Sequence, residues 1–124
     1  MNTRSISTIV TCVLAILLLP ATAGAHAFLD HADPKVGSTV VASPTQVSCW
    51  FDAEIEPDFC TLTVSDSTGK EVDAQDAHVD KVDHKLLIVS VPTLPPGKYK
   101  VAWTVVATDT HKTNGDFTFT IAGK

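Results

Sequence analysis

Asp109 and His111 are separated by one residue and come at the end of a long β-type run, Tyr99 to Thr108. In an extended chain, residues two apart project to the same face. This short segment can therefore aim a carboxylate and an imidazole at one point. Three nitrogens and one carboxylate oxygen form a ligand set that tetragonal Cu(II) prefers, so the pair supplies half of a candidate copper site.

His26 would supply the two missing nitrogens if it were the first residue of the mature protein. Residues 1–25 have the parts of a secretory signal peptide: Arg4, an apolar stretch and the small-residue cleavage site Ala23-Gly24-Ala25. Cleavage after Ala25 would give His26 a free α-amine beside its imidazole. Cleavage after Ala23 is the alternative, and it would leave two residues ahead of His26. An uncleaved anchor is a further alternative, although the apolar stretch is short for a membrane span.

The chain after the signal peptide, residues 26–124, is expected to be a single acidic domain in the periplasm. It keeps eight lysines against 14 acidic residues, a formal charge of −6, and it has no arginine. Binding to nucleic acid depends on clusters of Lys and Arg that neutralise phosphates. No nucleic-acid partner is therefore expected, and the acidic surface suits binding of cations. The protein is expected to be a monomer.

Short runs rich in Val, Ile, Thr and aromatic residues predict an all-β scaffold for the candidate ligands. No segment has the periodicity of a helix, and turn-forming residues separate the runs. About seven strands in a chain of this length favour an antiparallel sandwich or barrel. Strands are expected over residues 26–32, 45–52, 59–65, 71–75, 84–91, 98–108 and 116–121, with a hairpin loop at Lys112-Thr113-Asn114-Gly115.

Cys49 and Cys60 are the cysteines that remain after the signal peptide. An even pair in an exported protein predicts a disulfide, and the apolar alternation of their strands points both side chains inward. Two buried thiols are the alternative, and a thiolate site for Cu(I) is a third interpretation. The single methionine is Met1, so the mature chain has no thioether ligand for Cu(I).

Three other histidines are weaker candidates for metal binding. His31 follows His26 by five residues, which places it on the opposite face of an extended strand. His78 and His84 flank an acidic loop and are expected at the surface.

Five segments of the mature chain together form a specific pattern: His26-Ala27-x-Leu29, Asp33-Pro34-x-x-Gly37, Phe51 through Glu56-Pro57, Leu94-Pro95-Pro96-Gly97-x-Tyr99-x-Val101-x-Trp103, and Val105-Val106-Ala107-x-Asp109-x-His111-x-x-x-Gly115. In these segments the mature chain resembles the CopC family of periplasmic copper-resistance proteins, over nearly its whole length. This resemblance implies a cupredoxin-like Greek-key β-sandwich or barrel. It also implies a Cu(II) site made from the N-terminal amine and imidazole of His26 together with Asp109 and His111.

The chain departs from the family pattern in three places. Many members carry a Phe-Ser-Glu segment whose glutamate supports the amine; that position is Ala53 here, with Asp52 and Glu54 on either side. Groups behind the ligands orient them, so Asp52 and Glu54 are candidates to substitute. The methionine-rich Cu(I) site of some members is missing, which makes Cu(I) transfer doubtful. The cysteine pair is not part of the family pattern.

The leading hypothesis is a periplasmic Cu(II)-binding protein, not an enzyme, that sequesters copper or delivers it to an inner-membrane copper transport protein. The alternative is a copper monooxygenase-like redox enzyme, which would also use an N-terminal histidine. Asp109 argues against this alternative, because its negative charge opposes the Cu(I) state that oxygen activation needs. A metal-free adhesion or interaction sandwich is the third hypothesis.

Overall fold

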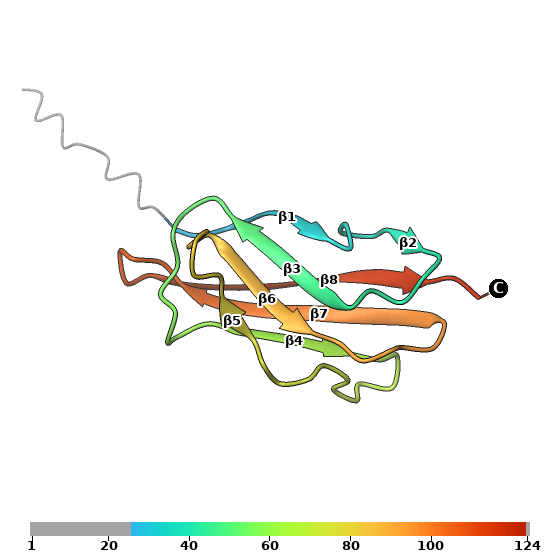
Figure 1. The fold of residues 1–124 in the computed structure, drawn as a ribbon. Helices are drawn as coiled ribbons and strands as arrows, with labels where there is room; N and C mark the ends of the chain where they lie inside the picture. Colours follow the sequence, from blue (N-terminus) through green and yellow to red (C-terminus); the bar gives the residue numbers. More distant parts are fainter. Residues whose placement is uncertain (1–25, 124) are drawn as a thin grey trace, which may run out of the picture.

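The computed structural model describes residues 26–123, which form two four-stranded β-sheets packed face to face (Figure 1). The strand orders are β1-β3-β6-β5 and β2-β8-β7-β4, so the chain crosses repeatedly between the sheets. The predicted all-β, cupredoxin-like sandwich is confirmed, with eight strands in place of about seven. The strands are Leu29–Asp33 (β1), Thr39–Val40 (β2), Gln46–Phe51 (β3), Thr61–Ser65 (β4), His78–Val79 (β5), Leu86–Ser90 (β6), Gly97–Val106 (β7) and Lys112–Ile121 (β8).

The hydrophobic core lies between the sheets and follows the alternation of side chains along each strand. Buried and more exposed residues alternate along β7, and β3 turns Val47, Cys49 and Phe51 inward. Burying an aliphatic or aromatic side chain stabilises a fold by about 1.5–3 kcal/mol, so these inward faces hold the two sheets together. The buried β7 residues are the predicted set Tyr99, Val101, Trp103 and Val105.

The longest hairpin joins β7 to β8, and its turn lies at residues 107–111. The predicted hairpin loop at residues 112–115 is wrong, because Asn114 and Gly115 pair with Thr104 and Trp103 inside the ladder. An ideal Cβ built on Gly115 would lie 2.6 Å from Cζ2 of Trp103. Packing of the indole ring, and not a turn, therefore requires glycine at this position.

The segment between β4 and β6 also differs from the prediction. The strand expected over residues 71–75 is reduced to an isolated bridge between Ser65 and Glu71. The short strand β5 lies instead in the segment expected to be a loop. Val79 is buried and pairs with Leu87, so one apolar contact adds an edge strand to a polar segment.

The predicted disulfide is absent, because Cys49 and Cys60 are both free thiols. Cys49 is fully buried in β3, and burial raises the pKa of its thiol to about 12. Cys60 lies just before β4 in the other sheet, and its thiol donates a hydrogen bond to the carbonyl of Glu56 at 3.0 Å. Burial also raises the pKa of Cys60. The alternative of two buried thiols is correct for Cys49, whereas Cys60 is half-buried. Neither thiol is prepared to act as a thiolate ligand.

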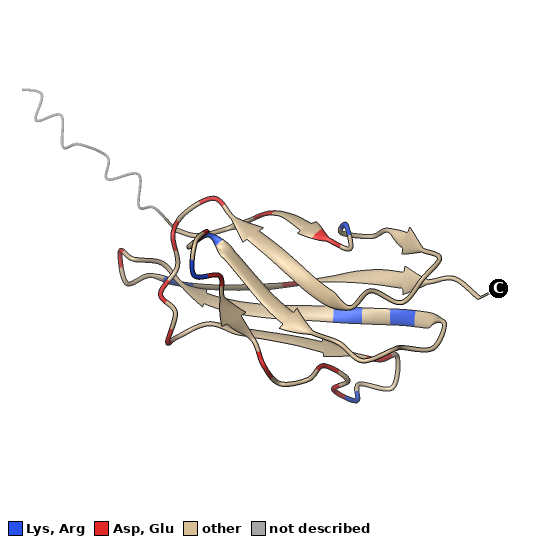
Figure 2. Ribbon diagram, in the orientation of Figure 1, with Lys and Arg blue, Asp and Glu red and all other residues tan. Residues whose placement is uncertain are grey.

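The start of the described chain and the β7–β8 turn lie at the same end of the sandwich, opposite the C-terminus (Figure 1). The loop that follows β3 also passes this end and is rich in acidic residues (Figure 2). These residues are Asp52, Glu54, Glu56 and Asp58. Clustered charge of one sign raises the local concentration of the opposite ion, so this end of the fold favours cations. Among residues 26–123, no helix is long and apolar enough to cross a membrane.

Candidate metal centre

A tight turn between β7 and β8 carries Asp109 and His111. The N–H of Thr110 donates to the carbonyl of Ala107 at 2.9 Å, and the N–H of Ala107 donates to the carbonyl of His111 at 3.0 Å. Thr110 has a φ of 74°, in the left-handed region that β-branched residues rarely adopt. The expected extended strand is therefore wrong at this point. The turn, and not one face of a strand, brings the carboxylate and the imidazole together.

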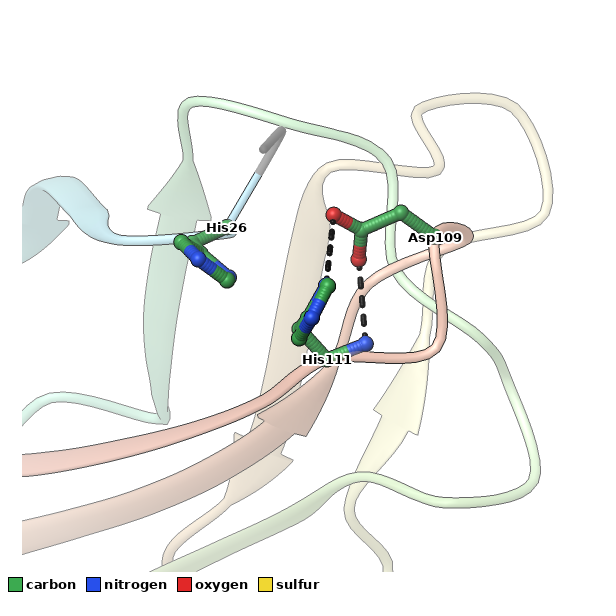
Figure 3. Close-up of side chains that lie close together, drawn as sticks. All are labelled: His26, Asp109 and His111. Carbon is green, nitrogen blue, oxygen red and sulfur yellow. Dashed lines mark hydrogen bonds and ion pairs between the residues drawn. The ribbon is translucent and has the colours of Figure 1, made fainter. Parts of the chain in front are cut away.

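The Asp109 carboxylate contacts His111 at two points. Its Oδ1 accepts a hydrogen bond from the backbone N–H of His111 at 3.0 Å, and its Oδ2 lies 3.1 Å from Nδ1 of the imidazole (Figure 3). The backbone N–H, followed by the His111 side chain and more weakly by His26, holds the pKa of Asp109 below its usual range. The carboxylate is therefore ionised near neutral pH.

One oxygen of Asp109 remains available to a ligand. Oδ2 is shielded from solvent, and despite its approach to His111 it accepts no well-oriented hydrogen bond within residues 26–123. Buried polar atoms are normally satisfied by a partner. A cation bound beside His111 would supply that partner.

His26 reaches the same point from the start of the described chain, at the same end of the sandwich. Its ring lies 4.4 Å from the ring of His111, with the two planes at 80° (Figure 3). One nitrogen of each imidazole and one oxygen of Asp109 lie within 4.8 Å of one another, and no other such trio is present in residues 26–123. Metal–nitrogen bonds of about 2 Å place ligand atoms roughly 3–4 Å apart. Small side-chain rotations would therefore bring the three donors onto one ion.

The donor set suits copper or another divalent transition metal. Imidazole nitrogens bind such ions well, and an ionised carboxylate offsets part of the charge. The α-amine of His26 would add a fourth donor after signal-peptide removal. The predicted cleavage after Ala25 lies outside the described residues.

The two acidic residues beside Ala53 have different surroundings. The carboxylate of Asp52 accepts a hydrogen bond from the backbone N–H of Phe28 at 2.8 Å, two residues from His26. The side chain of Glu54 is exposed, and only its backbone carbonyl approaches the turn, accepting from the N–H of Thr108 at 3.2 Å. The structure thus places Asp52, and not the Glu54 side chain, beside the N-terminal segment.

Thr113 is a contact that the sequence reasoning missed. Its hydroxyl donates a hydrogen bond to the backbone carbonyl of Ala27. No local sequence pattern marks this threonine. The sequence places it in a predicted hairpin loop, whereas in the structure it is the second residue of β8. Because the turn lies at residues 107–111, Thr113 follows His111 by two residues at the start of β8.

The remaining histidines lie outside the cluster and are exposed, which confirms the prediction for His78 and His84. The ring of His31 stacks on Trp50 at 4.5 Å and lies 2.7 Å from the carboxylate of Asp30. The rings of His78 and His84 hydrogen-bond to nearby backbone carbonyls. These contacts are local, and none involves a second potential metal ligand from a distant segment.

Several known proteins are similar to this chain, and two of the three described here have copper in their names. Copper resistance protein C of Xanthomonas campestris pv. juglandis is 32% identical over 124 residues, covering 95% of this chain and 96% of the relative. Protein YobA of Escherichia coli (strain K12) is 32% identical over 110 residues, covering 88% of this chain and 89% of the relative. Copper transport protein CutJ of Bacillus subtilis (strain 168) is 30% identical over 110 residues, which cover 88% of this chain but 20% of CutJ.

Solved structures share the fold. CopC from Methylosinus trichosporium OB3b superposes with a TM-score of 0.73 and 33% identity, covering 77% of this chain and 93% of that chain. PcoC, a methionine-rich copper resistance protein from Escherichia coli, superposes with a TM-score of 0.70 and 27% identity, covering 79% and 100%. The CopC domain model matches residues 29–122, which include both sheets and the turn with Asp109 and His111. The chain therefore belongs to the CopC family.

Proposed function

We propose that this chain is a periplasmic, monomeric Cu(II)-binding protein that sequesters copper or delivers it to an inner-membrane copper transport protein. The observation that carries the proposal is the convergence of His26, Asp109 and His111, whose potential ligand atoms lie within 4.8 Å of one another. The relatives named copper resistance protein C support copper as the metal. The comparisons give no support to the monooxygenase alternative.

The proposed ligands are the amine and imidazole of His26, the carboxylate of Asp109 and the imidazole of His111. The amine becomes available when the signal peptide is removed after Ala25. Three nitrogens with an anionic oxygen and no sulfur favour Cu(II) over Cu(I). Because its neighbours hold the pKa of Asp109 low, the carboxylate needs no deprotonation when the metal binds.

Delivery to a membrane transporter is supported by one relative. The chain matches 20% of the length of copper transport protein CutJ, so a domain of this kind and a longer additional segment occur there in one polypeptide. We infer that the separate chain meets a comparable transport protein as a partner. Storage and delivery use the same ligands, and the partner decides between them.

Copper titration of the mature protein beginning at His26 tests the proposal. With a competing chelator, we expect one Cu(II) bound per chain and no tight binding by His111→Ala, because the substitution removes an imidazole ligand. His84→Ala is the matched control, since His84 is exposed and outside the cluster. Failure of the parent to bind Cu(II), or unchanged affinity in His111→Ala, would overturn the proposal.

A precursor mimic tests the amine as a ligand. Adding one alanine before His26 converts the amine into a peptide nitrogen and should weaken Cu(II) binding sharply. Isothermal titration against the parent would measure the change. Equal affinity in the extended protein would exclude the amine from the ligand set.

A further inference from the structure

Residues 26–28, which include the proposed ligand His26, precede the first strand, since β1 begins at Leu29. The first residues of a domain are poorly ordered unless other parts of the fold hold them. A metal site that uses both nitrogens of its first residue needs the adjoining backbone to be fixed. In the structure, the side chain of Thr113 in β8 and that of Asp52, just after β3, hold the backbone of Ala27 and Phe28.

Thr113 holds the residue next to His26. Its hydroxyl donates to the backbone carbonyl of Ala27, and the Ala27 side chain is fully buried. Thr113 lies two residues after His111, at the start of β8. The hydrogen bond therefore links the segment that contains His26 to strand β8, which begins directly after His111.

Asp52, which directly follows β3, holds the next residue of the N-terminal segment, Phe28. Its Oδ1 accepts the backbone N–H of Phe28 at 2.8 Å, and its own N–H donates to the carbonyl of Phe28 at 3.0 Å. This two-bond contact continues the pairing of β1 with β3 beyond Leu29 and Phe51. The side chain and the backbone of Asp52 thus each bond to the backbone of Phe28, and the two bonds together hold that residue against the end of β3.

We propose that Thr113 and Asp52 are positioning residues for the metal site, which act through the backbone of Ala27 and Phe28 and not through the ion. The inference rests on the proposed function, because it takes His26 as the first residue and as a ligand. Ordering the backbone before the metal arrives reduces the conformational entropy lost on binding. Changes to groups that orient metal ligands typically weaken affinity about 10–100-fold.

The chain offers close controls for both residues. Thr118 is half-buried on the same strand as Thr113, and within residues 26–123 its side chain makes no hydrogen bond to the N-terminal segment. Glu54 is an exposed acid in the same loop as Asp52, and among the described residues its side chain makes no hydrogen bond to residues 26–28. Thr118→Val and Glu54→Ala therefore repeat the chemical changes without the proposed contacts.

Copper affinity of the mature protein is the first measurement. With chelator competition, Thr113→Val and Asp52→Ala should bind Cu(II) about tenfold more weakly than the parent or worse. Thr113→Ser keeps the hydroxyl and should restore most of the affinity, and both controls should match the parent. The electron paramagnetic resonance spectrum of copper-saturated Thr113→Val should keep the nitrogen and oxygen donors of the parent, because no ligand has been removed.

Amide hydrogen exchange gives a readout that needs no metal. The N–H of Phe28 donates to Asp52, so it should be protected in the metal-free parent. It should exchange faster in Asp52→Ala and in Thr113→Val, while core amides such as that of Val101 keep their protection. Equal loss of protection throughout the domain would mean general destabilisation and would contradict a positioning role.

The alanine-extended protein separates the possible failures. Without the amine as a ligand, fixing the backbone next to His26 matters less, so Thr113→Val should cost less affinity there than in the parent. An equal cost in both backgrounds would show that Thr113 acts elsewhere and would overturn the inference. If the parent binds Cu(II) and both Thr113→Val and Asp52→Ala bind it equally well, the inference fails while the proposed function stands. If the parent binds no Cu(II), the proposed function fails first.

Discussion

Replacing Gly115 with alanine would push a methyl group into the indole ring of Trp103, its partner across the β7–β8 ladder. An ideal Cβ at Gly115 lies 2.6 Å from Cζ2 and 2.9 Å from Cε2 of that ring. Carbon atoms in favourable contact are about 3.5–4.0 Å apart. The ring or the strand must therefore retreat by roughly 1 Å to restore contact distance.

Trp103 has little room to move. It is 7% exposed, and Phe51 packs edge-on against it with ring centroids 5.1 Å apart. Overpacking a core costs about 1–3 kcal/mol. Because a rigid ring must move here, and not the end of a flexible side chain, we expect a loss of about 2–3 kcal/mol. In a domain of about 100 residues this lowers Tm by roughly 10–20 °C.

Thermal and urea unfolding of the metal-free mature protein would measure the loss. Gly123→Ala is the matched control, because an ideal Cβ there meets nothing closer than Cβ of Pro96 at 3.9 Å. Trp103→Phe should reduce the cost of the alanine, since phenylalanine lacks the indole edge that meets the methyl group. Equal unfolding free energies for Gly115→Ala and Gly123→Ala would refute the reasoning.

Three further predictions concern the turn and the cysteines. Thr110→Gly should raise the unfolding free energy by about 1 kcal/mol, because glycine adopts a positive φ without steric cost; a lower Tm would contradict it. The pKa of Asp109 is lower in the folded protein than the value of about 3.9 of an unfolded aspartate. The ionised carboxylate therefore stabilises the fold above that pH, and this stability is lost as the pH falls through the lower folded pKa. The stability difference between metal-free parent and Asp109→Asn should therefore shrink as the pH falls below about 4, as seen by denaturant unfolding at each pH. Because Cys49 and Cys60 are free, a reductant should leave the melting curve unchanged, and a lowered Tm would reveal a bridge.

Much of the scaffold could be predicted from the sequence because sandwich strands have two chemically different faces. The alternation around Val101 and Trp103 indicates which side chains face the core, and the structure buries that set. The spacing of Asp109 and His111 also indicates a shared target, although a turn and not a strand aims them. The contribution of His26 depended on recognising the signal peptide and the family resemblance, since no local pattern links it to a turn so distant in sequence.

The wrong predictions share a physical cause, which is that tertiary packing overrode a local signal. Asn114-Gly115 is a strong hairpin pattern, but the indole of Trp103 needs the space above a glycine inside the ladder. The cysteine pair suggested a disulfide, yet burial and a carbonyl partner accommodate the two sulfurs separately. For Gly115 the deciding neighbour, Trp103, lies on the adjacent strand, whereas Cys60 bonds to a carbonyl four residues earlier in the chain.

The hydrogen bond from Thr113 to Ala27 joins residues 86 positions apart in the chain. The contact forms only when the first and last parts of the described chain have come together, so an unfolded chain keeps His26 apart from Asp109 and His111. Metal capture would then report that folding is finished. Since a ligand that binds only the native state stabilises it by about 2.7 kcal/mol at a hundredfold excess over Kd, the cargo would in turn protect its carrier from unfolding and proteolysis outside the cytoplasm.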